Sequence, residues 1–217
     1  MYNKITLFFT VVLAAVLFAG SGYSQTKSTG IFDGHGDVGP VKNKGNVKYD
    51  AKNHQYLVSG SGTNIWANTD EFQFVWKQIK GDFTIRTNAA FIGKGTELHR
   101  KFGLMVRKSL DGNSPHVNAV VHGDGLTSLQ YRKTTGAVTE EQKLTQTFAE
   151  VIQLERRGNT FIMSVAHKGE AFGSEEKIDL DLGDEVYVGI FVCSHNADVV
   201  EKAVFGKVKI TAGKPGK

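Results

Sequence analysis

Residues 99–132 carry the clearest strand pattern in the chain, HRKFGLMVRKSLDGNSPHVNAVVHGDGLTSLQYR. Three segments of this stretch, 102–107, 117–122 and 127–132, are rich in β-branched, aromatic and other apolar residues. They are separated by Asp111-Gly112-Asn113 and Gly123-Asp124-Gly125, clusters of the kind that end strands and form turns. The pattern predicts strands joined by turns, and we take these strands as neighbours in one sheet.

The same pattern continues on both sides of this stretch. Strand-like segments with glycine-bearing turns between them recur at residues 55–58, 72–79, 83–92, 148–156, 160–167, 186–193 and 203–210. Outside the N-terminal segment no window has a convincing helical period, and the nearest candidate, 139–148, reads equally well as a hairpin loop. The charge-dense run 174–184 reads as an edge strand and loop. About ten strands favour an all-β fold, a two-sheet antiparallel sandwich.

The N-terminus has the layout of a secretory signal peptide. Lys4 precedes an almost unbroken apolar run at residues 5–19, and small or polar residues follow up to Gln25. We predict a signal peptide at 1–24, cleaved before Gln25 or alternatively after Ser21, and one mature domain at 25–217. The run has about 15 residues and a spanning helix needs ~20, so an uncleaved anchor is the alternative. The protein is therefore expected to be exported, to the periplasm or outside the cell.

Charge and cysteine content narrow the function classes. The 26 Lys and Arg residues against 22 Asp and Glu give a net charge of +4, spread along the chain. Nucleic-acid binding calls for a clustered basic stripe, so no nucleic-acid partner is expected, nor is membrane insertion after signal cleavage. Cys193 is the only cysteine and cannot form an intrachain disulfide. Inside an apolar run it is predicted to be a buried small hydrophobe rather than a nucleophile.

Polar and apolar residues alternate along several of the predicted strands, as expected where one face is buried. The polar positions favour planar side chains with fixed hydrogen-bonding directions, which suit recognition of hydroxyls or carboxylates. If the strands are neighbours, one surface is lined by Arg86, Arg107, His122, Gln130 and Arg132. The alternative is an ordinary solvated strand face without a ligand.

Three stretches resemble a known group of domains. These are the segment from Gly81-Asp82-Phe83 to Phe91-Ile92-Gly93, residues 99–132, and VYVGIFVCSHNADVVEKAVFGKVKI at 186–210. They resemble secreted bacterial domains with a concanavalin A-like, laminin-G-like jelly roll, found alone, beside β-propellers in proteins labelled as biopolymer-transport components, and in polysaccharide utilisation. The resemblance covers roughly residues 31–210 and implies a jelly-roll fold. It is vague about activity, because the fold superfamily includes lectins, carbohydrate-binding modules, hydrolases and lyases.

The function we predict is recognition of a carbohydrate or other cell-surface polymer by the polar sheet face. The candidate ligand contacts are Trp66, Arg86, His99, Arg100, Arg107, His122, Gln130, Arg132, His195 and Asn196. One alternative is a polysaccharide-active hydrolase or lyase that uses part of the same surface. A second is a non-catalytic structural or partner-binding accessory domain.

The catalytic alternatives are only partly supported by residue types. Most glycoside hydrolases need two carboxylates flanking the scissile bond. No carboxylate pair alternates on a strongly patterned strand, since Asp179 and Asp181 lie in the exposed-looking run and Glu150 stands alone with an ambiguous facing. A lyase would need a base and a group that neutralises a uronate carboxylate, and His122, Tyr131, Arg107 and Gln130 are of the right types. No catalytic residue is assigned.

No cofactor or metal site is predicted, although the resemblance leaves a structural Ca²⁺ open. His116 and His122 would lie about 20 Å apart along a strand at ~3.3 Å per residue, too far to share an ion. An acidic loop with Asp33, His35 and Asp37 and the turn at Asp124 could offer oxygen ligands, but an Asp-Gly hairpin turn explains Asp124 better.

A glycine-rich motif and the two tryptophans can also be interpreted from the sequence. GHGDVG at 34–39 matches G-x-G-x-x-G, but no strand precedes it and no helix follows, so we expect no nucleotide site. Trp76 alternates with Phe72 and Phe74 and is predicted to be core, whereas Trp66 lies in a polar loop and suits an exposed platform.

Overall fold

The structure is a computed structural model that describes residues 29–213, so the predicted signal peptide lies outside the described residues. The described part is all β, with no helix. Its strands are β1 (Gly34–Val38), β2 (Asn46–Asp50), β3 (Gln55–Gly60), β4 (Phe72–Lys80), β5 (Phe83–Phe91), β6 (Lys101–Arg107), β7 (His116–His122), β8 (Thr127–Arg132), β9 (Glu140–Lys143), β10 (Val151–Arg157), β11 (Thr160–Ala166), β12 (Ser174–Asp179), β13 (Glu185–Cys193) and β14 (Glu201–Ala212).

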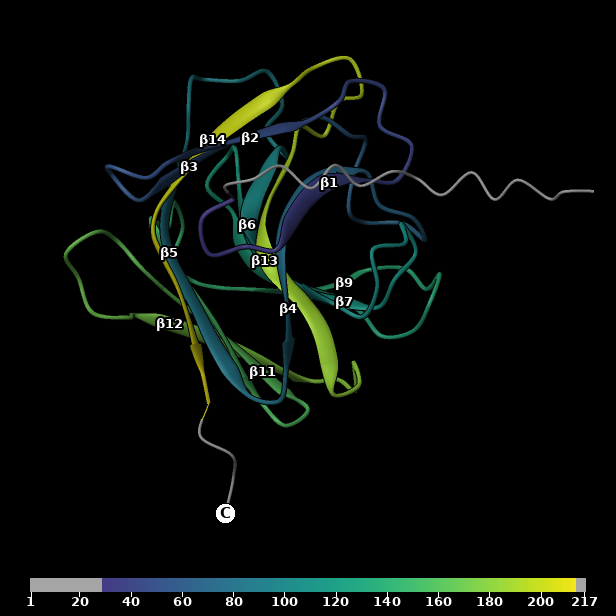
Figure 1. The fold of residues 1–217 in the computed structure, drawn as a ribbon, viewed down its shortest axis with the longest axis vertical. Helices are drawn as coiled ribbons and strands as arrows, with labels where there is room; N and C mark the ends of the chain where they lie inside the picture. Colours follow the sequence, from purple (N-terminus) through teal and green to yellow (C-terminus); the bar gives the residue numbers. More distant parts are fainter. Residues whose placement is uncertain (1–28, 214–217) are drawn as a thin grey trace, which may run out of the picture.

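Two antiparallel sheets of seven strands form a jelly-roll sandwich, which confirms the predicted fold class. Sheet A has the order β1-β4-β13-β6-β7-β8-β9, and sheet B has the order β12-β11-β10-β5-β14-β3-β2. Figure 1 shows them as two curved layers, with β5, β11 and β12 in one and β4, β7 and β13 in the other. The stretch 99–132 supplies β6, β7 and β8, which are consecutive neighbours in sheet A, as the sequence pattern predicted.

The strands that the sequence predicted are all present, with ends that differ by a few residues. The largest difference is at β10, which begins at Val151 rather than at residue 148. Phe148 has a φ of 51°, and this left-handed conformation is incompatible with an extended strand. The charge-dense segment after residue 174 is an edge strand, β12, as predicted.

Strands β1, β2 and β9 were not predicted. Residues 34–38 were read as part of an acidic loop, but they form β1 on the edge of sheet A, paired with β4. That interpretation was wrong because β1 has almost no apolar alternation, and its pairing depends on the neighbouring strand. Strands β2 and β9 also lie at the edges of their sheets, and they too are short strands whose pairing depends on one neighbour. Strand β9 occupies part of the predicted hairpin loop.

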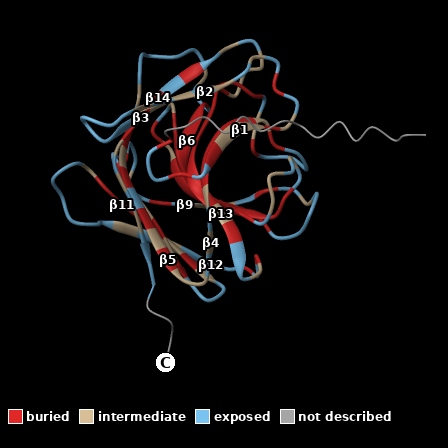
Figure 2. Cartoon of the chain, viewed as in Figure 1, coloured by how far each residue is buried: buried red, intermediate tan, exposed pale blue. Residues whose placement is uncertain are grey.

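The main core lies between the sheets, and Figure 2 shows buried residues concentrated in β6 and β13. Inward-facing residues from both sheets include Ile85, Leu104, Val117, Leu154 and Phe205, all without exposed surface. The period-2 alternation predicted from the sequence is therefore confirmed for these strands.

A second apolar cluster lies on the other face of sheet A. It contains Trp76, which is buried as predicted, together with Phe72, Met105 and Val120. Cys193 belongs to the same cluster and has no exposed surface, and burial raises the pKa of its thiol to about 11. Both faces of β6, β7 and β8 are consequently buried, which alternation alone did not indicate.

A loop that we call the strap, residues 61–71, covers this second face of sheet A. Ile65 at its centre is fully buried and forms an isolated β-bridge with Asp70. The Asp70 amide donates to the Gly112 carbonyl over 2.8 Å, and the Thr139 amide donates to the Trp66 carbonyl over 2.8 Å. The strap is thus fixed to the two loops that flank β7 and β8.

No helix in residues 29–213 is long and apolar enough to cross a membrane.

Candidate functional site

Three of the buried polar residues of sheet A are joined by one carboxylate in the strap. Asp70 accepts hydrogen bonds from Arg132 at 2.6 and 2.8 Å and lies 3.4 Å from Arg107 Nη2. His116 Nδ1 is 3.7 Å from the same carboxylate, and none of these side chains is exposed. Burial lowers the pKa of Arg107 to about 10, although Asp70 opposes the shift. Charges taken out of water are tolerated when they are paired in this way.

Arg107 and Arg132 therefore do not line a hollow that a ligand could enter. The remaining hydrogen bonds of their guanidinium groups also go to the protein, including the Ser109 carbonyl from Arg107 and the Ala67 and Ala137 carbonyls from Arg132. The structure gives both arginines a structural position beneath the strap, and the predicted common surface for five side chains is wrong in this respect.

Three other predicted ligand contacts lie elsewhere. Arg86 is exposed on sheet B, with its guanidinium carbon 4.8 Å from the centre of the Phe172 ring. Arg100 is buried and pairs with Glu201 over 2.7 Å. Asn196 lies in the turn after β13, where its Nδ2 is 3.4 Å from Glu97 Oε1.

The other five predicted contacts line one pocket. We call it the histidine pocket; its volume is about 310 Å³, and it is lined by Asn64, Trp66, His99, Lys101, His122, Leu126, Gln130, Glu141, Lys143 and His195. It brings together Trp66, His99, His122, Gln130 and His195 from the sequence prediction. Trp66, which lines this pocket, has 39% of its surface exposed.

Strand pairing explains why these side chains meet. Lys101 on β6 is the register partner of His122 on β7, and Gln130 on β8 is the register partner of Glu141 on β9. The two-residue period directs these side chains to the same side of sheet A as the Asp70 cluster. The strap adds Trp66 from above the sheet.

Hydrogen bonds fix the polar groups of the pocket. Lys101 Nζ donates to Asn64 Oδ1 over 2.8 Å and to the His99 carbonyl over 3.2 Å. Gln130 Nε2 donates to Glu141 Oε1 over 2.9 Å and lies 3.4 Å from His122 Nε2. Within residues 29–213, Gln130 Oε1 is buried and has no hydrogen-bond partner. A buried amide oxygen of this kind gains from a donor brought by a ligand.

The environment of the pocket favours the neutral form of His122 and of His195. Burial, followed by the nearby Lys101, lowers the pKa of His122 to about 4. Burial followed by Lys101 and His99 lowers the pKa of His195. His122 Nδ1 is 2.9 Å from the Leu126 carbonyl and must donate to it, so Nε2 carries the lone pair. The three rings lie close, with centroids 6.1 Å apart for His99 and His122 and 5.6 Å apart for His99 and His195.

The pocket thus combines an aromatic ring, neutral imidazoles, amides, two lysines and one carboxylate. Such groups donate to and accept from hydroxyls and can hold a sugar ring against an indole. Glu141 is the only carboxylate that lines the pocket among the described residues, so a two-carboxylate hydrolysis has no partner for it there.

Two of the residues that the sequence offered as oxygen ligands for Ca²⁺ are engaged within the protein. Asp124 Oδ1 accepts from the Leu126 amide in its turn, and Asp33 accepts from Lys77 and from the Gln78 amide. In the described part of the chain, no group of three or more His, Cys, Asp or Glu side chains is arranged to hold a metal ion.

Sequence reasoning missed several residues of the pocket. Lys101 was read as the residue before a strand, and Glu141 and Lys143 lie on the unpredicted strand β9. The parity of Lys101 with Arg107 along the same strand was a usable signal. Asn64 gave no signal beyond its place beside Trp66, because the position of the strap depends on tertiary contacts.

Comparison with known proteins identifies the fold. No protein-family profile and no curated protein matches the sequence. Among solved structures, a functionally unknown protein from Saccharomyces cerevisiae is similar with a TM-score of 0.60 and 14% identity, over 78% of this chain and 92% of that one. The alginate lyase from Klebsiella pneumoniae has a TM-score of 0.52 and 9% identity, over 78% and 85% of the two chains.

Lectin II from Ulex europaeus is similar at the same level, with a TM-score of 0.52 and 9% identity over 78% of this chain and 91% of the lectin. These neighbours are concanavalin- and lectin-like jelly-roll folds, which confirms the resemblance found in the sequence at the level of the fold. At identities this low the similarity establishes the fold alone.

Proposed function

We propose that the protein recognises a carbohydrate in the histidine pocket. Three features of the pocket support this: Trp66 presents part of its ring to solvent, neutral histidines and amides supply directional hydrogen bonds, and Lys101 supplies a fixed cation. The similar solved structures include a lectin and an alginate lyase, which supports a glycan-related function on this fold. The proposal retains the predicted recognition by the polar side of a sheet, but the residues that would contact the ligand are those that line the histidine pocket.

The observation that carries the proposal is the state of Gln130. Its Nε2 is anchored by Glu141, and its Oε1 is buried beside the pocket without a partner. A buried acceptor without a hydrogen bond costs about 1–3 kcal/mol, and a hydrogen bond donated by a hydroxyl of a bound sugar would recover this free energy. Trp66 lines the same pocket, where a sugar ring can stack on it.

The test is a glycan array followed by titration calorimetry of each glycan that binds. Trp66→Ala should weaken binding by about tenfold or more, since an aromatic anchor contributes at least ~1.4 kcal/mol. Ile31→Ala is the matched control, because Ile31 is exposed to nearly the same extent, 40% against 39%, and lies outside the pocket. Equal loss in both variants, or no glycan bound by the wild type, contradicts the proposal.

The same samples address the enzymatic alternative. Incubation with polysaccharides followed by assays for new reducing ends and for unsaturated products distinguishes binding from cleavage. Product formation that depends on His122 would replace recognition by catalysis as the function of the pocket.

The proposal includes export, for which the support is the N-terminal sequence alone. The apolar run at 5–19 and the small residues after it predict cleavage before Gln25. N-terminal sequencing of the protein recovered from the periplasm and the medium checks this. An intact residue 1 in membrane fractions would support the uncleaved anchor.

A further inference from the structure

A groove runs along β5 of sheet B, and its far end reaches β6 and β7 of sheet A at Phe102 and His122. It consists of three hollows of about 490, 300 and 450 Å³. The first two share Asn88, Lys168 and Lys207, and the last two share Ala90 and Glu150, so they adjoin in a row. We call this row the β5 groove.

The groove exists because strands separate at this point. Strand β10 pairs with β5 only from residue 151 onward, and the Ala89 amide donates to the Glu150 carbonyl at the end of the ladder. On the other side, the pairing of β14 with β5 shifts register between Gly206 and Lys209. Such a bulge bends the strand and redirects a side chain.

The bulge places Lys207 in the groove at a conformational cost. Its φ is 54°, in the left-handed region that a lysine rarely adopts. Non-glycine residues in this region are strained and persist where the surrounding structure fixes them. Lys207 is exposed and lines two of the hollows.

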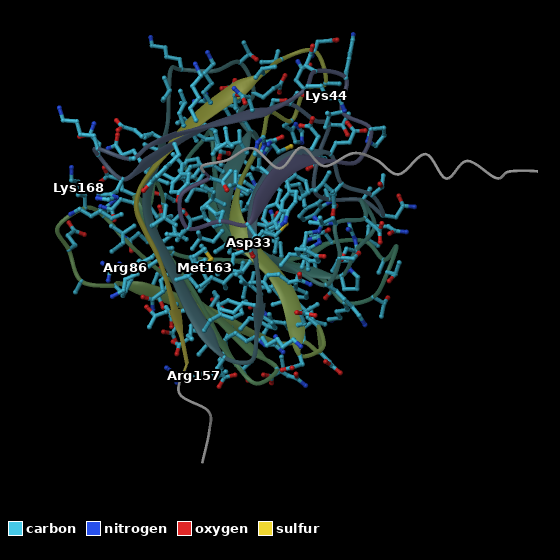
Figure 3. The ribbon with its side chains drawn as sticks, viewed as in Figure 1. Asp33, Lys44, Arg86, Arg157, Met163 and Lys168 are labelled. Carbon is cyan, nitrogen blue, oxygen red and sulfur yellow. The ribbon has the colours of Figure 1, made fainter. Side chains whose placement is uncertain are left out.

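Two more cations stand in the same part of the groove. Arg86 and Lys168 line it together with Lys207, and all three side chains are exposed. Figure 3 shows Arg86 and Lys168 on the same side of the molecule. Across residues 29–213 no carboxylate lies within ion-pair distance of any of the three. Three unpaired cations around one hollow are a site for anionic groups.

Hydrogen-bond acceptors stand beside these cations. Glu150 accepts from the Lys168 amide and lines the middle hollow, and Glu170 and the Asn88 amide line the first. A ligand with anionic charge alone, such as a polyglutamate, gains nothing from two carboxylates. A ligand that also carries hydroxyl donors does, and acidic sugars combine both groups.

An aromatic ring closes the other end of the groove. Phe148 lines the third hollow, with 61% of its surface exposed and a φ of 51°. Its ring packs on Gly125, where any side chain would overlap it. An exposed ring held in a fixed position offers a surface for stacking a sugar.

We propose that the β5 groove binds a segment of acidic polysaccharide. Its carboxylate or sulfate groups lie against Arg86, Lys168 and Lys207, its hydroxyls reach Glu150, and a ring stacks on Phe148. This second site is distinct from the histidine pocket, because neither its three cations nor Phe148 line that pocket, and His122 is the one lining residue that the two share.

The experiment measures binding to polygalacturonate, alginate and chondroitin sulfate by biolayer interferometry at physiological salt. The test variant is K168A/K207A, and the control is K177A/K202A. The control removes two exposed, unpaired lysines of sheet B that line none of the three hollows, so net charge changes equally. K168A/K207A should weaken binding about tenfold or more, with the control within about twofold. Phe148→Asn, which tolerates the left-handed conformation, should weaken it about fivefold.

Two polymers separate sugar recognition from plain charge attraction. Methyl-esterified polygalacturonate keeps the sugar backbone without the charge, and poly-L-glutamate keeps the charge without the sugar; both should bind at least about tenfold more weakly than polygalacturonate. If none of the three acidic polysaccharides binds, the proposal is overturned. Equal losses in the two double variants, or equal affinity for poly-L-glutamate, also overturn it. Trp66→Ala should leave this binding unchanged, so failure at the β5 groove and failure of the histidine pocket are told apart.

Discussion

Asp70 and Arg132 form a two-pronged ion pair in the interior, with Oδ1 2.6 Å from Nη2 and Oδ2 2.8 Å from Nη1. The pair joins the strap to β8, and neither side chain is exposed. Because Arg107 reaches the same carboxylate, one aspartate compensates two buried cations. The strap is therefore part of the folded core of the protein, and Trp66 at its tip is held over the histidine pocket.

Replacement of Asp70 should show how much this arrangement contributes. Asp70→Asn leaves two arginines buried without a counter-charge, so we expect the free energy of unfolding to fall by about 3–5 kcal/mol in urea titrations. Asp198→Asn is the control, since Asp198 pairs with Lys42 at the exposed surface and should change stability by less than about 1 kcal/mol. Similar effects of the two substitutions would mean that the buried pair contributes little. Arg107→Ala is also expected to destabilise, because it removes a buried side chain and leaves the Ser109 and Asp111 carbonyls without its hydrogen bonds, so it cannot report on ligand contact.

Stability should fall as the solution becomes mildly acidic. Burial lowers the folded-state pKa of His116 and of His122 to about 4, against about 6.5 in the unfolded chain. Between pH 6.5 and 4 the unfolded state therefore binds more protons, and each histidine lowers the free energy of unfolding by about 1.4 kcal/mol per pH unit. Urea titrations of the wild type, His116→Gln and the exposed-site control His54→Asn measure the slope. It should flatten only in His116→Gln; an unchanged slope in that variant would show that His116 does not titrate in this way.

The centre of sheet A should not tolerate a side chain at Gly189. A Cβ at this position would overlap the Val75 carbonyl oxygen of the neighbouring strand, so the backbone must move. We expect Gly189→Ala to lower stability by about 3 kcal/mol or more. At Gly206 the nearest atom to a Cβ is 3.8 Å away, so Gly206→Ala should leave stability unchanged or raise it by up to about 1 kcal/mol. If thermal unfolding ranks the two variants the other way, β4 and β13 do not approach each other this closely at Gly189.

The strand and turn pattern was sufficient to predict a two-sheet β-sandwich, the family resemblance implied the jelly roll, and alternation predicted the side of the sheet for residues of the central strands. It placed Leu104 opposite Arg107 and Leu129 opposite Gln130, and the structure has them so. It failed where pairing depends on a neighbour, as in β1, and where one backbone conformation ends a strand, as at Phe148.

The candidate site was less predictable because alternation does not tell which faces loops cover. Arg107 and His122 both lie on the polar side of sheet A. Arg107 is buried under the strap, whereas His122 lines the histidine pocket. The difference is set by Asp70, which lies in a segment without strand pattern and was not recognised as the partner of two arginines. Only tertiary contacts distinguish the polar residues of sheet A that are buried under the strap from those that line the histidine pocket.

Gln130 is the residue at which binding and stability can be separated. Gln130→Met keeps the length of the side chain, removes the buried Oε1 that has no partner among the described residues, and removes the hydrogen bond to Glu141. The lost bond and the lost unpaired acceptor offset each other, so stability should change by no more than about 1 kcal/mol. Glycan affinity measured by calorimetry should fall at least about tenfold, because the acceptor for a ligand hydroxyl is gone.

Gln142→Met provides the matched control for this change. Gln142 Oε1 is also buried and unpartnered within residues 29–213, but Gln142 lies on β9 outside the lining of the pocket. Full affinity in Gln142→Met together with loss in Gln130→Met would place the ligand at the amide of Gln130. Full affinity in both variants would remove that amide from the site, and unfolding of Gln130→Met would show that its bond to Glu141 holds β8 to β9 instead.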